Sequence, residues 1–412
     1  MRLAKSLSVY AFAMLFNAAL SFATFSLLTH HLTEVDFGII NLYNSFTIFI
    51  VPFIGVGIQF TLSVDYFKMD EASYRTHFSN AVLIPITSCL ILTVLCLIFF
   101  YPLQQLIKVN FFFALTLPFS GLLIVLNDVM LSLIRNKGKH ILYAGFSIAR
   151  NVVEISLTIL FVVGLGMAWR GRLASALMAL IASGFVVYYL VRKWRLYNGN
   201  YNKDEIKKVI ITGLPFIPER LAIFVLAYSD RFFIDFYRGI GDVGYYGAGA
   251  QIGIIVNLCT LTLISTFHPY IFKNLSTLDF KSVRKATLSF IGISLFVTAS
   301  VIIGTPYLFK FFIGKNFQPG QVYAKLIAIG YFFWAIYAVF MAYLLYLKKN
   351  RGLMTISILG MILSLSLNFI NVKKFGAIGA TYTSILVYFF MAAAAVYTVH
   401  KFIGLKKIFL RA

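Results

Sequence analysis

The chain has 412 residues, of which 60% are hydrophobic and only 12% charged, whereas soluble proteins contain about 25% charged residues. A water-soluble fold of this composition would expose large apolar patches, so the composition excludes a soluble enzyme, a disordered chain and a collagen-like rod. Lysine and arginine outnumber acidic residues by 36 to 14, a formal net charge of +22. Because these basic residues interrupt long apolar runs, they are typical of the loops of a membrane protein rather than of a nucleic-acid-binding surface.

Twelve apolar runs are long enough to cross a bilayer, for which a helix needs about 20 residues. Strands of an outer-membrane barrel would be about 10 residues long with alternating faces. The runs therefore predict an all-α polytopic membrane protein with twelve transmembrane helices. The predicted spans are 7–29, 38–64, 77–101, 111–134, 141–167, 172–191, 209–236, 243–268, 285–309, 322–347, 352–372 and 376–400.

The first run, which follows Arg2 and Lys5, is longer than the apolar region of a secretion signal and lacks a convincing cleavage site. We interpret it as a spanning helix retained in the mature chain. The loops on the N-terminal side of the membrane hold roughly three times as many basic residues as the opposite loops. Because basic loops stay in the cytoplasm, both termini are expected to be cytoplasmic. The opposite loops hold Lys108, Arg170, Arg172, Arg238, Lys310, Lys315, Lys373 and Lys374.

The most polar stretch, residues 192–208, divides the spans into two sets of six. It predicts an N-terminal six-helix bundle over 1–191, a cytoplasmic linker over 192–208 and a C-terminal six-helix bundle over 209–412. Equal halves of the same orientation indicate a parallel repeat, related by a pseudo-two-fold axis along the membrane normal. A short echo supports the repeat: Asp36-Phe37-Gly38 opens the second span and Asp242-Val243-Gly244 opens the eighth.

Catalytic and cofactor signatures are absent from the sequence. It has no nucleotide-binding motif, no metal-ligand spacing and no long loop to carry catalytic acids. The three cysteines, Cys89, Cys96 and Cys259, lie inside apolar runs and have neither disulfide nor zinc spacing. We therefore expect no enzyme activity, no cofactor and no metal.

Ionisable residues inside the predicted spans are the main candidates for function, because a charge in the bilayer costs roughly 2.5–3.5 kcal/mol on insertion scales. Arg150 and Glu154 share one face of the fifth span. They form either a neutralising pair or a site in which Glu154 orients Arg150 toward a cavity. Asp128 in the fourth span is expected to cap or to pair with Arg135.

The seventh span carries an unusual number of charges, which cannot all face lipid. An eleven-residue spacing predicts that Glu219 and Asp230 share one face, as do Arg220 and Arg231, so this face should meet a cavity or a partner helix. Asp235 is the fifth charge. The spans also contain prolines that favour kinks: Pro215 and Pro218 in the seventh, and Pro52, with Gly55 and Gly57, in the second.

Single polar residues on apolar helices either form hydrogen bonds between helices or line a cavity for hydroxyl-rich cargo. Asn17, Gln59 and Asn257 are candidates for the second role, and Gln251 and Asn368 are similar. Arg150 and Arg220 are predicted at similar depth, one from each half. Because arginine binds phosphate oxygens with two parallel hydrogen bonds, a cavity containing both would attract an anionic cargo.

The chain resembles the Wzx-like polysaccharide and O-antigen flippases of the multidrug/oligosaccharidyl-lipid/polysaccharide (MOP) exporter superfamily. The resemblance is carried by short stretches that occur in order across most of the chain. They are Leu32-Thr33-Glu34-Val35-Asp36-Phe37-Gly38, Leu133-Ile134-Arg135-Asn136-Lys137-Gly138-Lys139 with Tyr143, Trp169-Arg170-Gly171-Arg172-Leu173, Gly213-Leu214-Pro215-Phe216-Ile217-Pro218, Ser229-Asp230-Arg231-Phe232-Phe233-Ile234, Val243-Gly244-Tyr245-Tyr246, Gly314-Lys315-Asn316-Phe317 and Gly376-Ala377-Ile378-Gly379-Ala380.

This resemblance implies a bacterial inner-membrane flippase that moves undecaprenyl-diphosphate-linked oligosaccharide, the lipid-linked precursor of surface glycans such as the O-antigen of lipopolysaccharide. We expect Arg150, Arg220 and Arg231, with the polar residues above, to bind the diphosphate and sugars. Glu154, Glu219 and Asp230 are the candidates for coupling to a proton or cation. Further expected partners are membrane lipid, a polysaccharide polymerase and a chain-length regulator, with no nucleic acid.

Three other functions are compatible with parts of the pattern. A drug or metabolite exporter of the same superfamily would have an acidic, aromatic-lined cavity. A membrane polymerase or ligase would need a loop domain with paired acids. A scaffold that transports nothing would have its intramembrane charges fully paired.

Overall fold

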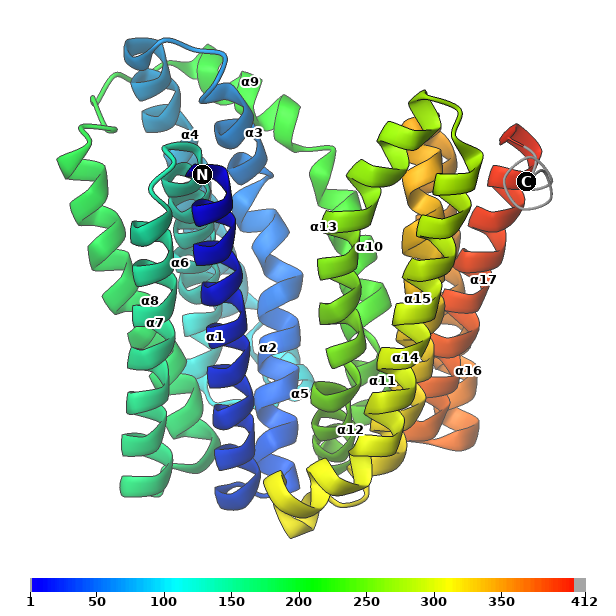
Figure 1. Cartoon of the computed structure of the whole chain (residues 1–412). Coiled ribbons are helices and arrows are strands. Elements are labelled where there is room, and N and C mark those ends of the chain that lie inside the picture. The colour runs from blue at the N-terminus through cyan, green and yellow to red at the C-terminus, as the bar shows by residue number, and fades with distance from the viewer. Residues whose placement is uncertain (1, 404–412) are drawn as a thin grey trace. The chain divides into compact units, whose positions relative to one another are not determined.

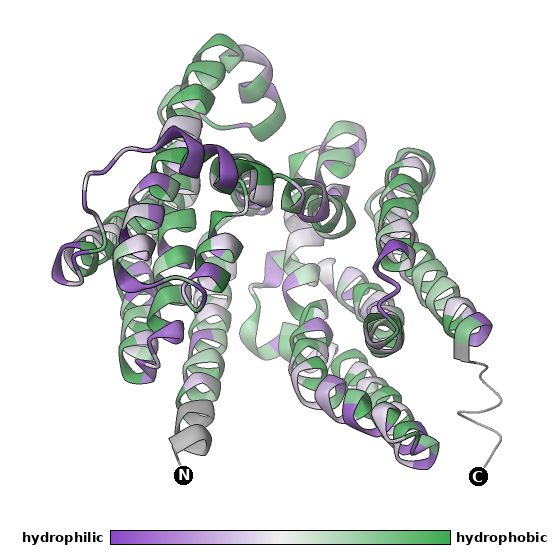
Figure 2. Cartoon of the chain, turned by 90° about the horizontal axis from the view of Figure 1, so that it is seen from above, coloured by the Kyte–Doolittle hydropathy of each residue, from purple (hydrophilic) through white to green (hydrophobic). Residues whose placement is uncertain are grey.

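The computed structural model describes residues 2–403, and every regular element in that range is a helix. Lys406, Lys407 and Arg411, which contribute to the predicted charge bias, lie outside the described residues. Contacts divide the chain into two compact units, Met1–Leu32 with Ile39–Phe224 (unit 1) and Thr33–Gly38 with Val225–Ala412 (unit 2). Apolar residues dominate the helices, and polar residues gather in the connecting segments (Figure 2).

Unit 1 is built around α6 (Phe111–Asn136), which packs against α4 (Glu71–Ile98), α7 (His140–Thr158) and α8 (Ala168–Lys193). Helix α1 (Arg2–His31) lies along α7, and α7 lies beside α8 (Figure 1). The remaining elements are α2 (Glu34–Gly55), α3 (Ile58–Asp65), α5 (Phe100–Ile107), the π-helix η1 (Ile159–Gly164), α9 (Lys203–Gly213) and most of α10 (Phe216–Tyr228).

Unit 2 is built around α15 (Gly320–Tyr346), which packs mainly against four other helices and makes a smaller contact with α16. These are α12 (Ile240–Gly253), α13 (Ile255–Ser276), α14 (Phe280–Phe312) and α17 (Ala377–Ile403). Its core contains fully buried Phe290 and Tyr343. The unit also contains α11 (Asp230–Arg238), the short 3₁₀ helix η2 (Lys315–Phe317) and α16 (Asn350–Phe375).

Eleven described helices are long and apolar enough to cross a membrane, and there are twelve when the bent pair α9–α10 counts as one span. The predicted twelve-helix membrane fold is therefore confirmed, with ends that differ by a few residues. Several ends depend on capping side chains: the Asp70 carboxylate accepts hydrogen bonds from the backbone N–H groups of Ala72 and Ser73 at the start of α4. These hydrogen bonds lower the pKa of Asp70.

The helix interruptions follow the prolines and glycines of the sequence. The second span breaks after Gly55, where Val56 and Gly57 take positive φ angles of 44° and 71°. The seventh span bends by 40° between α9 and α10, at Pro215. The two breaks pack closely within unit 1, because a Cβ added to Gly57 would lie 2.9 Å from the carbonyl oxygen of Gly213.

The two acids that were predicted to share one face of the seventh span differ in burial. Glu219 lies exposed on α10 in unit 1, whereas Asp230 begins α11 and is buried in unit 2. Ser229, between α10 and α11, keeps helical dihedral angles (φ −67°, ψ −26°), so the difference in burial reflects what packs around each acid. The two acids therefore occupy different environments.

The division into contact units differs from the predicted halves. The boundary falls at Phe224, inside the predicted seventh span, and residues 33–38 of the second span join unit 2. The predicted linker packs on unit 1 through Asn80 of α4, whose side chain is fully buried. Its amide donates to the carbonyl of Asn200 (2.8 Å) and accepts from the N–H of Asn202 (2.8 Å). The pseudo-two-fold relation of the halves stays a prediction.

The residues of the sequence echo meet within unit 2. A Cβ on Gly38 would collide with the carbonyl oxygen of Ile240, and a Cβ on Gly244 would collide with that of Glu34. Glu34 and Ile240 each lie two residues before the aspartate of their own echo motif. The contact is therefore reciprocal, as at an interface between two symmetry-related copies, and glycine is required because the backbones approach so closely.

Substituting Gly244 with alanine should destabilise the protein by about 1–3 kcal/mol, because the added methyl group meets backbone that cannot rotate away. Thermal unfolding of the purified chain in detergent measures this effect. The matched control is Gly292→Ala, also within a helix but with open space around its Cβ position. It should leave the midpoint unchanged or raise it, and an equal loss in both variants would contradict the role of the reciprocal contact.

Substituting Asn80 with alanine should release the linker, because it leaves the N–H of Asn202 and the carbonyl of Asn200 without their partner. Loss of such buried hydrogen bonds costs about 1–3 kcal/mol. We expect trypsin to cleave after Arg195 or Lys203 about tenfold faster, given that 1.4 kcal/mol is a factor of ten. Thr87→Ala on the same helix is the control, since its exposed hydroxyl bonds only to its own helix.

Candidate functional site

Three ionisable side chains from different helices lie within electrostatic range of one another in unit 1. The carboxylate of Asp128 on α6 interacts with the guanidinium groups of Arg150 on α7 and Arg220 on α10. Asp128 and Arg220 are exposed on the surface of the unit, and Arg150 is partly exposed. An exposed charge on a spanning helix cannot face acyl chains cheaply, so this face must meet a polar environment. Asp128 thus faces these two arginines, which differs from the expected pairing with Arg135.

Arg150 also lines a groove of about 290 Å³ between α7 and α8. The other lining residues are Leu142, Gly145, Phe146, Ala149, Val153, Ala179, Ala182, Ser183 and Val186. The Nε atom of Arg150 is buried and has no hydrogen-bond partner. A guanidinium with an unused donor inside an apolar groove is suited to an amphiphilic anion.

Glu154 does not pair with Arg150, which corrects the pairing suggested by their i, i+4 spacing. Its Oε1 atom accepts a 2.6 Å hydrogen bond from Nη2 of Arg172 on α8. Both side chains are largely buried, with exposed fractions of 16% and 17%. Arg172, predicted in a loop, lies in the first turns of α8 because that helix begins at Ala168. Glu154 thus neutralises Arg172, and the acid that interacts with Arg150 is Asp128.

Arg220 lies over an aromatic pair in unit 1. Its guanidinium carbon is 4.9 Å from the ring centre of Phe60 on α3, and Phe60 stacks on Phe216 with a centroid distance of 4.7 Å. Cation–π contact of this kind holds the guanidinium in place without neutralising it. Glu219, the neighbouring acid, is exposed on α10, and Gln59 is partly buried beside Phe60 on α3.

Asn17 is occupied by contacts between helices. Its Nδ2 donates to the hydroxyl of Ser147 (2.7 Å), and its Oδ1 accepts from Nδ2 of Asn151 (2.9 Å), which joins α1 to α7. Asn257, in unit 2, is partly buried and its Oδ1 has no hydrogen-bond partner. The surface of unit 1 that carries Asp128, Arg150 and Arg220 is called the unit 1 face below, and Asn257 belongs to unit 2.

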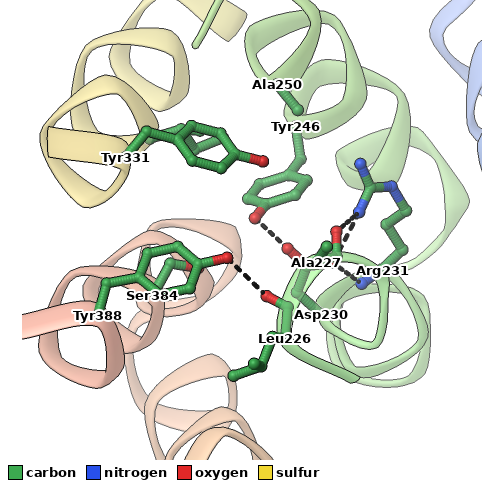
Figure 3. A pocket seen from close by; sticks show the side chains of 10 residues that line it. Leu226, Ala227, Asp230, Arg231, Tyr246, Ala250, Tyr331, Ser384 and Tyr388 are labelled. Carbon is green, nitrogen blue, oxygen red and sulfur yellow. Dashed lines mark hydrogen bonds and ion pairs between the residues drawn. The ribbon is translucent and has the colours of Figure 1, made fainter. Parts of the chain in front are cut away.

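Unit 2 contains its own buried ionic cluster. Asp230 and Arg231 form an ion pair of 2.9 Å between Oδ1 and Nη1, and the hydroxyl of Tyr246 donates to Oδ2 of Asp230 (Figure 3). Nη1 of Arg231 also donates to the carbonyl of Ala227 at 2.9 Å. Both ions are more than nine-tenths buried, and the pair is thereby neutralised and hydrogen-bonded, as buried charges require.

The space beside this cluster is small. It measures about 20 Å³ and is lined by Tyr331, Tyr388 and Ser384 as well as the ion pair (Figure 3). The hydroxyl of Tyr388 donates to the carbonyl of Leu226 at 3.1 Å. This volume holds about one water molecule and no sugar, so the arrangement suits a clamp between α10–α11, α12, α15 and α17 better than a cargo site.

Reasoning from the sequence missed the partners of Asp128 and the role of the tyrosines. Asp128 was recognisable as an intramembrane acid, but its partners come from helices that are distant along the chain. The tyrosines gave no signal, because 24 tyrosines occur in the sequence. Among residues 2–403, no group of three or more His, Cys, Asp or Glu side chains is arranged to hold a metal ion.

The profile of a family described as "Polysaccharide biosynthesis protein" matches residues 3–275. The "Lsg locus putative protein 1" of Haemophilus influenzae (strain ATCC 51907 / DSM 11121 / KW20 / Rd) is 26% identical over 198 residues, which cover 47% of this chain and 49% of that protein. The chain thus matches about half the length of this relative. An "Uncharacterized membrane protein" of the same strain is 22% identical over 368 residues, 87% of this chain and 88% of that protein.

Two solved structures have the same fold with little sequence identity. A multidrug resistance MATE family transporter of the MOP superfamily, in an inward-facing conformation, is 13% identical with a TM-score of 0.77, covering 95% of this chain and 96% of that one. The lipid II flippase MurJ, in an inward closed conformation, is 15% identical with a TM-score of 0.77, covering 97% of this chain and 88% of that one.

The likeness extends over nearly the whole chain, so the two bundles of six helices seen in these transporters are also the architecture of this protein. The family profile covers all of unit 1 beyond its first two residues and reaches the end of α13. The chain is therefore a membrane protein of the MOP fold and belongs to the polysaccharide biosynthesis protein family.

Proposed function

We propose that this protein is a flippase for polyprenyl-diphosphate-linked oligosaccharides, with undecaprenyl diphosphate as the lipid carrier. It would move repeat units from the cytoplasmic to the periplasmic leaflet of a bacterial inner membrane by alternating access, with both termini in the cytoplasm. The family match to polysaccharide biosynthesis supports the glycan. The fold shared with the lipid II flippase MurJ supports transport of a lipid-linked substrate.

The observation that carries the proposal is that two guanidinium groups, those of Arg150 and Arg220, meet around one carboxylate in unit 1. Arg150 and Arg220 share a single acid, Asp128, and Glu154 is occupied by Arg172. A diphosphate supplies the oxygens that two arginines can bind bidentately. In this proposal the diphosphate binds Arg150 and Arg220, while Gln59 and the Phe60–Phe216 pair contact the sugars. Arg231 and Asn17 take supporting roles, because Arg231 lies in an ionic cluster with no room for cargo and the side chain of Asn17 is bonded between α1 and α7. Asn257 belongs to unit 2 and has no part in the proposed site.

Coupling to a proton or cation is part of the proposal, and the geometry ranks the candidate acids. Asp230 and Glu154 are each bound to an arginine. Asp128 and Glu219 are exposed beside Arg220, so their charge can change when a diphosphate competes for the arginines. We propose Asp128 and Glu219 as the coupling acids. A polymerase and a chain-length regulator would receive the product in the opposite leaflet.

Replacing Arg220 with alanine should reduce surface glycan about 10- to 100-fold in a strain that lacks its own flippase, because a charge-assisted hydrogen bond contributes roughly 1.5–3 kcal/mol. Arg150→Ala should act similarly, and lysine at either position should restore only part of the activity, since lysine cannot bind bidentately. Arg192→Ala is the control, an exposed arginine at the end of α8. If the Arg220→Ala variant is expressed at the normal level and the amount of surface glycan does not fall, Arg220 is not part of the site.

The alternative is a drug or metabolite exporter, since the MATE transporter above has an equal TM-score. An exporter of organic cations would need an acidic cavity, whereas two arginines, Arg150 and Arg220, meet on the unit 1 face. Cells that overproduce this protein should therefore gain no resistance to cationic dyes. A resistance that rises with expression and is lost in Asp128→Asn would favour the exporter, and full glycan complementation without resistance would favour the flippase.

A further inference from the structure

Two lysines at one membrane surface of unit 1 are held against a single tryptophan. Nζ of Lys137 lies 5.2 Å and Nζ of Lys139 lies 4.9 Å from the ring centre of Trp194, and Lys137 also lies 5.5 Å from the ring of Tyr66. Cation–π contacts fix the position of an ammonium group while leaving its charge intact. The turn between α6 and α7 thus presents two fixed positive charges beside the end of α8.

The backbone of this turn explains why the lysines point to the same ring. Helix α6 ends in a Schellman motif, in which N–H of Gly138 donates to Arg135 (2.9 Å) and N–H of Lys139 donates to Ile134 (3.1 Å). Gly138 takes φ +66°, as this motif requires, and nothing lies within 4 Å of its Cβ position. The turn is therefore well defined and open to approach from outside.

No acid neutralises the two lysines. Among the described residues, neither Lys137 nor Lys139 has an ion pair, and the nearby Glu71 is bound to Arg75 at 2.7 Å. Burial and the adjacent Lys139 lower the pKa of Lys137, against the opposite effect of Glu71. An anion placed at the turn would remove this repulsion and raise the pKa again.

The second half of the chain repeats the arrangement within unit 2. Helix α15 ends in the same motif, in which N–H of Lys348 donates to Leu345 (3.0 Å) and N–H of Lys349 donates to Leu344 (2.9 Å). Lys349 occupies the same position of the motif as Lys139, and its Nζ lies 4.2 Å from the ring centre of Phe402. In both halves the aromatic residue lies near the end of the sixth helix of that half. The repetition indicates a function beyond ordinary loop charge.

We propose that each lysine–aromatic turn binds the phosphate of an anionic phospholipid headgroup, with Lys137, Lys139 and Trp194 forming the stronger site. The turns connect spanning helices and therefore lie at the height of lipid phosphates. Lysine ammonium groups near the surface attract anionic lipids, and the partly exposed tryptophan suits the interface, where an aromatic ring has one apolar and one wet side. These sites are separate from Arg150 and Arg220 and do not depend on the flippase proposal.

The test uses Trp194 as its own reporter, since the chain has only three tryptophans. In the full-length Trp169→Phe/Trp334→Phe variant, reconstituted into phosphatidylcholine vesicles, Trp194 fluorescence should be quenched more by brominated phosphatidylglycerol than by brominated phosphatidylcholine. Lys137→Gln/Lys139→Gln should reduce this preference about fivefold per lysine. Arginine at both positions should keep it, as should the control Lys203→Gln/Lys207→Gln, which removes two exposed lysines of α9.

Equal quenching by the two lipids would overturn the proposal, and so would a preference that survives the double glutamine substitution. A third arm adds inorganic phosphate at millimolar concentration. If it displaces the brominated lipid from Trp194, the turn binds free phosphate and the assignment to a lipid headgroup is wrong. Unchanged quenching in this arm, with loss in the glutamine variant, supports the headgroup site.

Discussion

The cost of leaving an ionised side chain against hydrocarbon is the constraint on which this structure depends. Each intramembrane charge is either bonded to a partner or placed on a face that must be wet. Two ion pairs are of the bonded kind: Glu154–Arg172 in unit 1 and Asp230–Arg231 in unit 2. Asp128 and Arg220 are of the other kind, because they lie on exposed faces of spanning helices. This difference separates the pairs that hold helices together from the charges that are available to cargo.

Glycines allow helix backbones to approach each other closely within each unit. Gly57 and Gly213 let the breaks of the second and seventh spans approach closely within unit 1, and Gly38 and Gly244 let the starts of the second and eighth spans approach in unit 2. Breaks of this kind are tolerated in membranes only where protein or water covers the freed backbone groups. The second span contributes to both units: its start, up to Gly38, belongs to unit 2 and the rest belongs to unit 1.

The two proposals rest on different chemistry at different depths. The arginine face lies within the spans and offers bidentate donors, which suit a diphosphate. The lysine–aromatic turns lie at helix ends and offer single ammonium groups held by aromatic rings, which suit the phosphodiester of a bilayer lipid. Turns of the same geometry occur at the ends of α6 and α15. The same backbone motif also ends α8 and α13, so what the ends of α6 and α15 share is the lysine at its last position, Lys139 and Lys349.

The membrane class, the twelve spans, the break after Gly55 and the bend at Pro215 were determined by the apolar runs and by the positions of glycine and proline, because these features depend on local hydropathy and local backbone preference. The pairing of charges was decided only by tertiary structure. Helical spacing joined Glu154 to Arg150 and aligned Glu219 with Asp230. In the structure Glu154 binds Arg172, and Asp230 is buried in unit 2 whereas Glu219 is exposed in unit 1. An ion pair depends on distances between helices, and no periodicity along one helix contains that information.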